Sequence, residues 1–323
     1  MLGALPHKTK QFFFLLIKLS IVFGASYFIY NKLANNPNLD FKVFIDFTSK
    51  NSVFSTKNIT FLVILTIFNW FFEILKWQNL VSVIKNISFF EALKQSLASL
   101  TASLFTPNRI GEYGAKALYF SSSRKKVMLL NLISNMSQML ITTILGGIGF
   151  IVFTSKYEIN IDSFKILRIL VFGVMIISFT VFGVRRNKIK IRGFDFSKII
   201  DFIKSISRIV ITKTFVFSLT RYLIFSFQFY YLLTIFGIDV YYINAMIVIS
   251  SMYLLSSIIP SIFIFDVIVK GSVALYLFNI VDVNDLTILS IITIMWLLNF
   301  VLPSIVGSAF VMSFNYKNTF KTN

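Results

Sequence analysis

Long apolar runs, separated by short polar and charged segments, dominate this chain. A helix needs roughly 20 apolar residues to cross a bilayer, and several runs reach that length. The pattern predicts full spans at about 12–33, 59–77, 127–153, 166–184, 215–236 and 286–314, the last one kinked near Pro303 and Gly307.

Two further apolar segments are interrupted by proline. The first covers about 96–120 and contains Pro107, and the second covers about 243–278 and contains Pro260. Proline lacks a backbone N–H and its ring clashes with the preceding turn, so it breaks a helix. We expect each segment to form a re-entrant helical hairpin, which enters and leaves on one side of the membrane. The alternative is that both segments cross fully, which gives eight spans.

The distribution of basic residues predicts the orientation. Lys and Arg gather before the first span, around Arg124 and in a basic amphipathic connector at 185–213, while the opposite loops are richer in acids. Cytoplasmic loops carry the excess of Lys and Arg, so both termini are expected to be cytoplasmic, in the plasma (inner) membrane. The hairpins then enter from opposite sides. The chain, 1–323, is predicted to be one all-α polytopic domain, with halves 12–154 and 166–314 as an inverted repeat.

Composition supports a membrane protein and excludes several chemistries. Hydrophobic residues make up 56% of the chain, and the mean hydropathy is +0.80. The net charge of +18 does not indicate nucleic-acid binding, because the bases sit between apolar spans. With no cysteine and a single histidine, His7, we expect no disulfide, metal or cofactor.

The strongest candidate site follows Pro107. Arg109, Glu112 and Lys116 are spaced i, i+3 and i+7, which places them on one face of a helix. Ionisable groups at membrane depth are expensive, so they usually face a wet cavity or a partner. The cluster is therefore interpreted as a substrate site; the competing interpretation is a network of charges that only neutralise one another.

The second broken segment repeats part of this pattern. Asp266 precedes Lys270 by four residues, as Glu112 precedes Lys116, and a Leu-Tyr pair follows in both places. In an inverted repeat the two acids would approach one midplane cavity from opposite leaflets. We expect that cavity to lie near Arg221.

Other polar residues within the predicted spans are secondary candidates. Glu73 either has a functional role or forms a structural pair with Lys76, and Arg221 needs an anion, which is a carboxylate or a lipid phosphate. Asn135 shares a face with two other amides, and polar residues there usually hold helices together. The remaining ones are Gln228, seven residues after Arg221, and Asn299, which is expected to pack beside Trp296.

The run Thr106-Pro107-Asn108-Arg109-Ile110-Gly111-Glu112 resembles the TPGRxGE signature of the flippase-like membrane family, which includes the transmembrane region of lysylphosphatidylglycerol synthases. The stretch from Pro260 to Asp266 is similar to that family's second signature, although apolar residues replace its glycine-rich turn. The resemblance covers nearly the whole chain. It implies lipid translocation and assigns roles to Arg109, Glu112 and Asp266. Synthase activity is not expected, because the resemblance covers only the transmembrane region and not the soluble aminoacyl-transferring domain of the synthases.

The expected function is therefore movement of an anionic phospholipid or polyprenyl-phosphate-type lipid between leaflets, without enzymatic activity. Membrane lipids are the expected partners; a second copy of the chain or an envelope-synthesis enzyme are further candidates. Two other functions stay open: a membrane-embedded enzyme that acts on lipid headgroups, and a non-transporting scaffold for envelope synthesis.

Overall fold

The computed structural model of the chain describes residues 41–51, 53–104, 106, 110–158, 196–258 and 266–314, with a few single positions between 16 and 27. All regular structure in these ranges is helical. Four segments are long and apolar enough to cross a membrane: α3 (Thr56–Val81), α6 (Arg124–Lys156), α9 (Arg208–Ile235) and the continuous stretch Asp285–Ser313. This confirms the all-helical prediction for the described residues and is consistent with a membrane protein. The predicted span at about 166–184, and nearly all of the span at about 12–33, lie outside the described residues.

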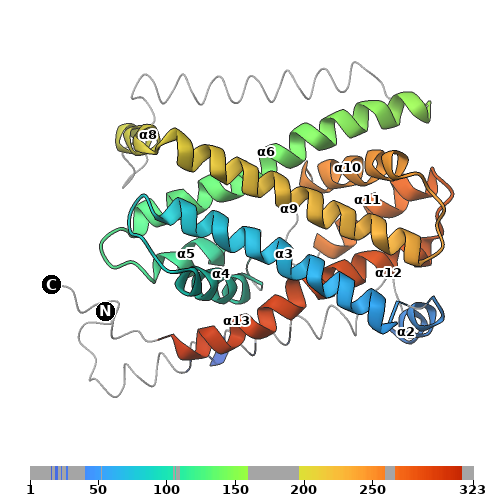
Figure 1. The fold of residues 1–323 in the computed structure, drawn as a ribbon, viewed down its shortest axis with the longest axis horizontal. Coiled ribbons are helices and arrows are strands. Elements are labelled where there is room, and N and C mark those ends of the chain that lie inside the picture. The colour runs from blue at the N-terminus through green and yellow to red at the C-terminus, as the bar shows by residue number, and fades with distance from the viewer. Residues whose placement is uncertain are drawn as a thin grey trace.

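Shorter helices complete the described structure. The two segments expected to be broken by proline each contain two helices, and the last long segment contains a π-helical turn between two α-helices (Figure 1). The elements are α2 (Phe41–Lys50), α4 (Phe89–Ser103), α5 (Gly111–Ala117), α8 (Phe196–Ser205), α10 (Tyr242–Ile258), α11 (Asp266–Asn279), α12 (Asp285–Trp296), η3 (Leu297–Val301) and α13 (Leu302–Ser313).

Side-chain caps fix where several helices begin. Ser88 and Glu91 form a capping box at the start of α4, and the side chain of Ser207 accepts a hydrogen bond from the Val210 amide at the start of α9. Because of this cap, α9 begins at Arg208, inside the segment predicted as the connector, and α8 is a separate short helix before it.

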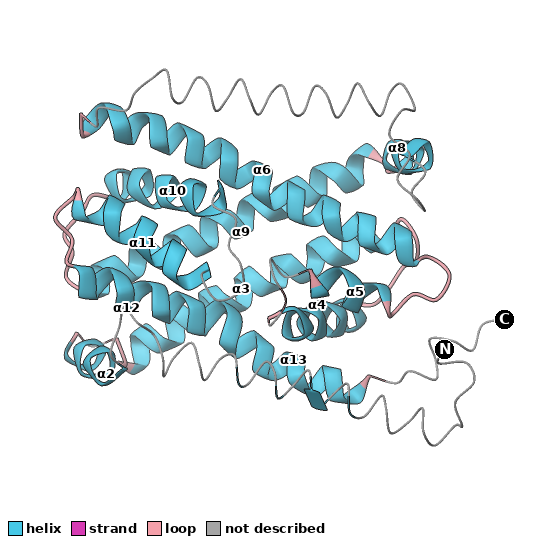
Figure 2. Cartoon of the chain, turned by 180° about the vertical axis from the view of Figure 1, so that it is seen from behind, coloured by secondary structure: helices cyan, strands magenta, loops and turns pink. Residues whose placement is uncertain are grey.

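Helices from the first and the second half of the described chain pack against one another. The central pair is α3 with α9. Around it, α4 of the first half packs on α13 of the second, and α10 of the second half packs on α6 of the first. Glycines permit the close packing of α13 on α4 and of α6 on α10. Gly307 lies against Leu97 and Thr101, and Gly146 lies against Leu254. The α4–α5 pair and the α10–α11 pair lie at opposite ends of the bundle (Figures 1 and 2).

The correspondence extends to single residues of α3 and α9. Ser55 caps α3 as Ser207 caps α9, each through the amide three residues later. Asn69 and Arg221 follow these caps at the same distance along their helices, 152 residues apart in the chain, and they contact each other. Equivalent positions of the two central helices therefore meet directly.

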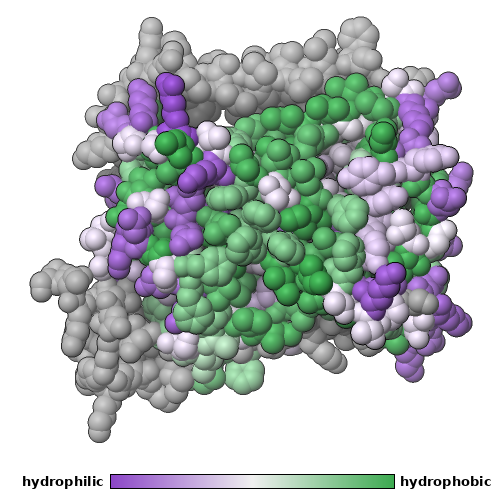
Figure 3. Space-filling view, in the orientation of Figure 1, coloured by the Kyte–Doolittle hydropathy of each residue, from purple (hydrophilic) through white to green (hydrophobic). Residues whose placement is uncertain are grey.

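One face of the bundle has an apolar middle and two polar ends. Figure 3 shows hydrophobic side chains across the centre of the bundle and hydrophilic ones at both ends. Large apolar side chains such as Ile67, Met136 and Leu223 are exposed along the long helices. Inside, one apolar core surrounds Phe229, Phe278 and other residues of α9–α12, and a second surrounds Trp77 and Leu130 beside α3, α5 and α6.

Candidate functional site

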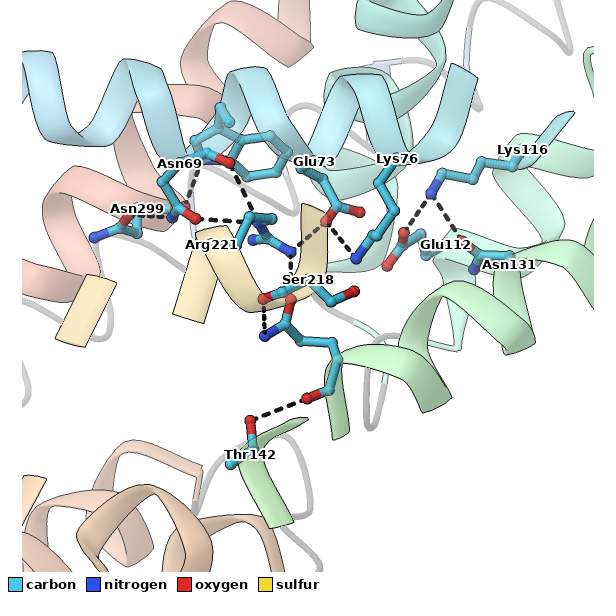
Figure 4. A network of polar contacts seen from close by, with 12 residues as sticks. Asn69, Glu73, Lys76, Glu112, Lys116, Asn131, Thr142, Ser218, Arg221 and Asn299 are labelled. Carbon is cyan, nitrogen blue, oxygen red and sulfur yellow. Dashed lines mark hydrogen bonds and ion pairs between the residues drawn. The ribbon is translucent and has the colours of Figure 1, made fainter. Parts of the chain in front are cut away.

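Arg221 of α9 lies at the centre of a polar network that joins four long helical segments (Figure 4). One of its terminal nitrogens, Nη1, forms an ion pair with Glu73 of α3 and also donates to Gln138 Oε1 of α6 at 3.3 Å. Its Nε donates to the Asn69 carbonyl oxygen at 3.2 Å and to Asn69 Oδ1 at 3.1 Å. The guanidinium therefore fixes three helices relative to one another.

Glu73 holds two cations at once. Besides Arg221, the ammonium of Lys76 lies 2.8 Å from Glu73 Oε2. Lys76 is 1% exposed, whereas the side chain of Arg221 retains 17% of its accessible surface. Of the two cations, Arg221 is therefore the more exposed.

A chain of side-chain amides continues from Arg221. Asn69 Nδ2 donates to Asn299 Oδ1 at 2.8 Å, and Asn299 Nδ2 donates to Gln228 Oε1 at 2.9 Å. Gln228 Nε2 then donates to Thr66 Oγ1 at 2.9 Å. Each amide uses both its donor and its acceptor, so the chain has one direction and a defined set of rotamers.

The π-helical turn of η3 places Asn299 in this chain. Pro303 has no N–H to donate to the carbonyl of Asn299, four residues earlier, so the regular α-helical bond cannot form there. The indole Nε1 of Trp70 donates to that carbonyl instead, at 3.1 Å. The turn is therefore satisfied by a neighbouring helix while it presents the Asn299 side chain to the amide chain.

A second buried ion pair lies beside the first. Lys116 of α5 donates to Glu112 Oε1 and to Asn131 Oδ1, both at 2.8 Å, and it is 1% exposed. Its ammonium lies 4.3 Å from the centroid of the Trp77 ring, whose Nε1 donates to Gln95 Oε1 at 2.8 Å. The charge of Lys116 also acts on Glu73, so the two pairs belong to one electrostatic cluster.

This network lies at the middle of the apolar bundle. Asn69, Gln138, Arg221 and Asn299 each lie within two residues of the midpoint of the long helical segment that carries them. Glu73, Lys76 and the second ion pair lie from there toward the end of the bundle where α3 ends. Charges at such a depth are stable only when they are paired or hydrated.

The sequence-predicted residues fall into three groups. Glu112, Lys116, Arg221, Glu73 and Gln228 all take part in the polar cluster, and Asn135 lies beside it, donating to the Tyr113 hydroxyl at 3.0 Å. Pro107, Arg109 and Pro260 lie outside the described residues. Asp266 and Lys270 belong to the first turns of α11, but their side chains also lie outside the described part.

Two expectations from the sequence gain detail. The Glu73–Lys76 pair is present, but Arg221 shares the carboxylate. The anion that Arg221 requires is thus the Glu73 carboxylate, whereas Glu112 pairs with Lys116. That Glu112 and Asp266 share one cavity stays a prediction.

Several contributors were not predicted as site residues. Asn299 was expected only to pack, and Thr66, Gln95 and Trp77 were not singled out. Pro303, four residues after Asn299, is a sequence signal for the freed carbonyl at Asn299. Nothing in the sequence indicates that Lys116 lies over Trp77, because that contact depends on how α5 packs against α3.

Comparison of the chain with protein-family models, with curated proteins and with solved structures gave no match. The resemblance to the flippase-like family therefore stays a prediction from the motif residues.

The cluster carries more positive than negative charge. The five charged residues placed here, Glu73, Lys76, Glu112, Lys116 and Arg221, comprise three cations and two carboxylates. Both carboxylates are paired with cations. Within the described ranges no group of three His, Cys, Asp or Glu side chains could hold a metal ion.

Proposed function

We propose that the protein is an integral membrane lipid translocase that moves an anionic lipid, of the phospholipid or polyprenyl-phosphate type, between leaflets. The observation that carries the proposal is the partly accessible Arg221, within a net-positive cluster at the middle of an apolar bundle. An anionic headgroup must cross about 30 Å of hydrocarbon. A cationic centre at the middle of the bundle would stabilise the headgroup where the hydrocarbon provides no polar partner.

Arginine suits the recognition of a phosphate. Its planar guanidinium can donate two parallel hydrogen bonds to two phosphate oxygens. Lys76 and Lys116 would add positive charge on the side where α3 ends. Arg109, and Asp266 with Lys270, are proposed to complete the site from the two hairpins.

The proposed architecture has six full spans and two re-entrant hairpins, α4–α5 and α10–α11, in an inverted repeat. The corresponding packing of the two halves and the position of the hairpins at opposite ends support it. Hairpins that enter from opposite leaflets would provide one gate for each side of a shared site. Each gate packs on the last long segment of the other half, which would couple the two gates mechanically.

The charge at the two ends supports a cytoplasmic location for both termini, in the plasma (inner) membrane. Among the described residues, the end that carries α4, α5 and α8 is basic, with Lys85, Lys94, Arg124, Lys125, Lys126, Lys204 and Arg208. The opposite end is richer in acids, with Asp46, Glu158, Asp239, Asp282 and Asp285. Positive loops face the cytoplasm.

Translocation in liposomes of defined composition tests the proposal. The full chain is reconstituted with fluorescent phosphatidylglycerol or fluorescent polyprenyl phosphate, and accessibility of the label to a membrane-impermeant quencher is followed in time. We expect faster translocation of at least one of these lipids than in protein-free vesicles. Arg221→Gln should abolish the increase, whereas Lys213→Gln, which removes an exposed charge from the same helix, should preserve it.

Equal rates in vesicles with and without protein, for both lipids, would contradict the translocase. Chemical change of the labelled headgroup without movement would favour the membrane-embedded enzyme. The scaffold would be favoured if the lipid neither moved nor changed chemically and the protein bound an envelope-synthesis protein.

A further inference from the structure

Glu73 occupies the cations that a translocated headgroup would need. We infer that the carboxylate of Glu73 and the phosphate of the lipid compete for Arg221 and Lys76, so that binding of one anionic headgroup is accompanied by uptake of one proton at Glu73. This inference rests on the proposed function and adds to it a coupling of lipid movement to protons.

The competition follows from the geometry around Glu73. Its carboxylate accepts from Lys76 of its own helix and from Arg221 of α9, and it is under the field of Lys116 of α5. The helices α4, α6 and η3 also pack against α3, and the charges that act on Glu73 include those of Arg221, Lys76 and Lys116. A carboxylate and a phosphodiester both offer two oxygens to a guanidinium, so either anion can satisfy Arg221.

The loss of its cations favours a proton on the displaced Glu73 carboxylate. In the state described, Glu73, Lys76, Glu112, Lys116 and Arg221 sum to one positive charge. A phosphodiester added with Glu73 still ionised would place two anions side by side in an apolar environment, one of them without its cations. A displaced buried carboxylate becomes neutral more readily than it stays unpaired. With Glu73 protonated, the cluster and its lipid again sum to one positive charge.

The exchange involves no covalent change in the lipid. The ion pairs of Glu73 with Arg221 and Lys76 break, ion pairs of the phosphate with the same cations form, and an O–H bond forms on Glu73. The proton comes from water on the side where the site is open, and it is released when Glu73 recovers its cations. One lipid anion and one proton therefore move together, without net charge.

Unpaired donors near the cluster indicate where headgroup oxygens or water would fit. Asn131 Nδ2, Ser134 Oγ and Ser218 Oγ are buried and have no hydrogen-bond partner among the described residues. Asn131 accepts from Lys116 through its other amide atom, and Ser218 lies one helical turn before Arg221. Buried donors without partners are uncommon in folded proteins, and here they occur beside a cluster with excess positive charge.

Calorimetric titration of the purified full chain in detergent measures the proton directly. Short-chain phosphatidylglycerol is the main probe, because its phosphodiester does not itself titrate near neutral pH. Farnesyl phosphate serves as the second probe, to distinguish a phospholipid from a polyprenyl phosphate. Titrations in two buffers of different ionisation enthalpy give the number of protons taken up per lipid. We expect uptake of about one proton per lipid. The affinity for the lipid should then fall about tenfold for each unit rise in pH.

Glu73→Gln should bind the same probe without proton uptake and with little pH dependence. The control Asp239→Asn, an exposed acid at the opposite end of the bundle, should keep both properties of the unaltered protein. If Glu73→Gln does not accumulate, the number of protons taken up by the unaltered protein still tests the coupling. Binding and translocation without proton uptake would overturn the coupling and leave the translocase intact. Failure of both probes to bind, together with no translocation, would instead overturn the translocase and the coupling with it.

Discussion

Arg221 and Glu73, 148 residues apart in the chain, form an ion pair between α9 and α3, the two helices at the centre of the bundle. Because Asn69 contacts the same guanidinium, one residue of α9 is tied to two successive turns of α3. The pair thus holds the central helices in register and also forms the core of the proposed site.

The effects of Glu73 and Arg221 variants on the free energy of unfolding should not be additive. Glu73→Gln leaves the buried Lys76 and the partly buried Arg221 without their shared anion, and Arg221→Gln leaves Glu73 with Lys76 alone. Breaking a buried pair from one side costs about 3–5 kcal/mol. We expect each single variant to lower the free energy of unfolding in detergent, and the double variant to lose less than the sum of the two. Strict additivity would mean that the two side chains do not interact in solution.

Asn299 should be important for stability although it carries no charge. Asn299→Leu removes the partners of Asn69 Nδ2 and Gln228 Oε1, and each unsatisfied buried group costs about 1–3 kcal/mol. Thr143→Leu is the control, because Thr143 is exposed and its hydroxyl bonds only to its own helix. Its free energy of unfolding should change by about 0.5 kcal/mol or less. Similar values for both variants would show that the amide chain adds little stability.

Gly307 and Gly147 should respond in opposite ways to alanine. A Cβ at Gly307 would overlap the Leu97 carbonyl oxygen and the Thr101 hydroxyl of α4, whereas a Cβ at Gly147 meets nothing. Gly147→Ala should be neutral, or stabilising by up to about 1 kcal/mol through helix propensity. Gly307→Ala should destabilise by about 1–3 kcal/mol through overpacking. Thermal unfolding of the two variants measures the difference, and equal melting temperatures would contradict the close approach of α13 to α4.

Labelling of single cysteines in sealed cells tests the proposed orientation. The native chain has no cysteine, so each replacement is the only reactive thiol. Cysteines at Lys125 and Ser197 should react only after the membrane is made permeable, and cysteines at Asn51 and Asp282 should react with an impermeant reagent at once. Reaction at Lys125 in intact cells would exclude both the re-entrant first hairpin and the inverted repeat.

The sequence by itself determined the long helices in the described part of the chain. Apolar runs of the length that a bilayer requires predicted all four long segments, and Ser55, Ser88 and Ser207 fix local starts through side-chain caps. It also indicated the pairs within one helix, Glu73–Lys76 and Glu112–Lys116, because residues three or four apart necessarily lie together on a helix.

Only the tertiary structure decided which helices are joined by ion pairs and side-chain hydrogen bonds. Nothing local in the sequence shows that Arg221 forms an ion pair with Glu73 or that Asn131 accepts a hydrogen bond from Lys116. The same is true of the hydrogen bonds by which Asn299 links Asn69 and Gln228. The physical reason is that periodicity defines which face of a helix is polar, but not the neighbour toward which that face turns. That choice follows from the packing of α3 on α9, of α4 on α13 and of α10 on α6.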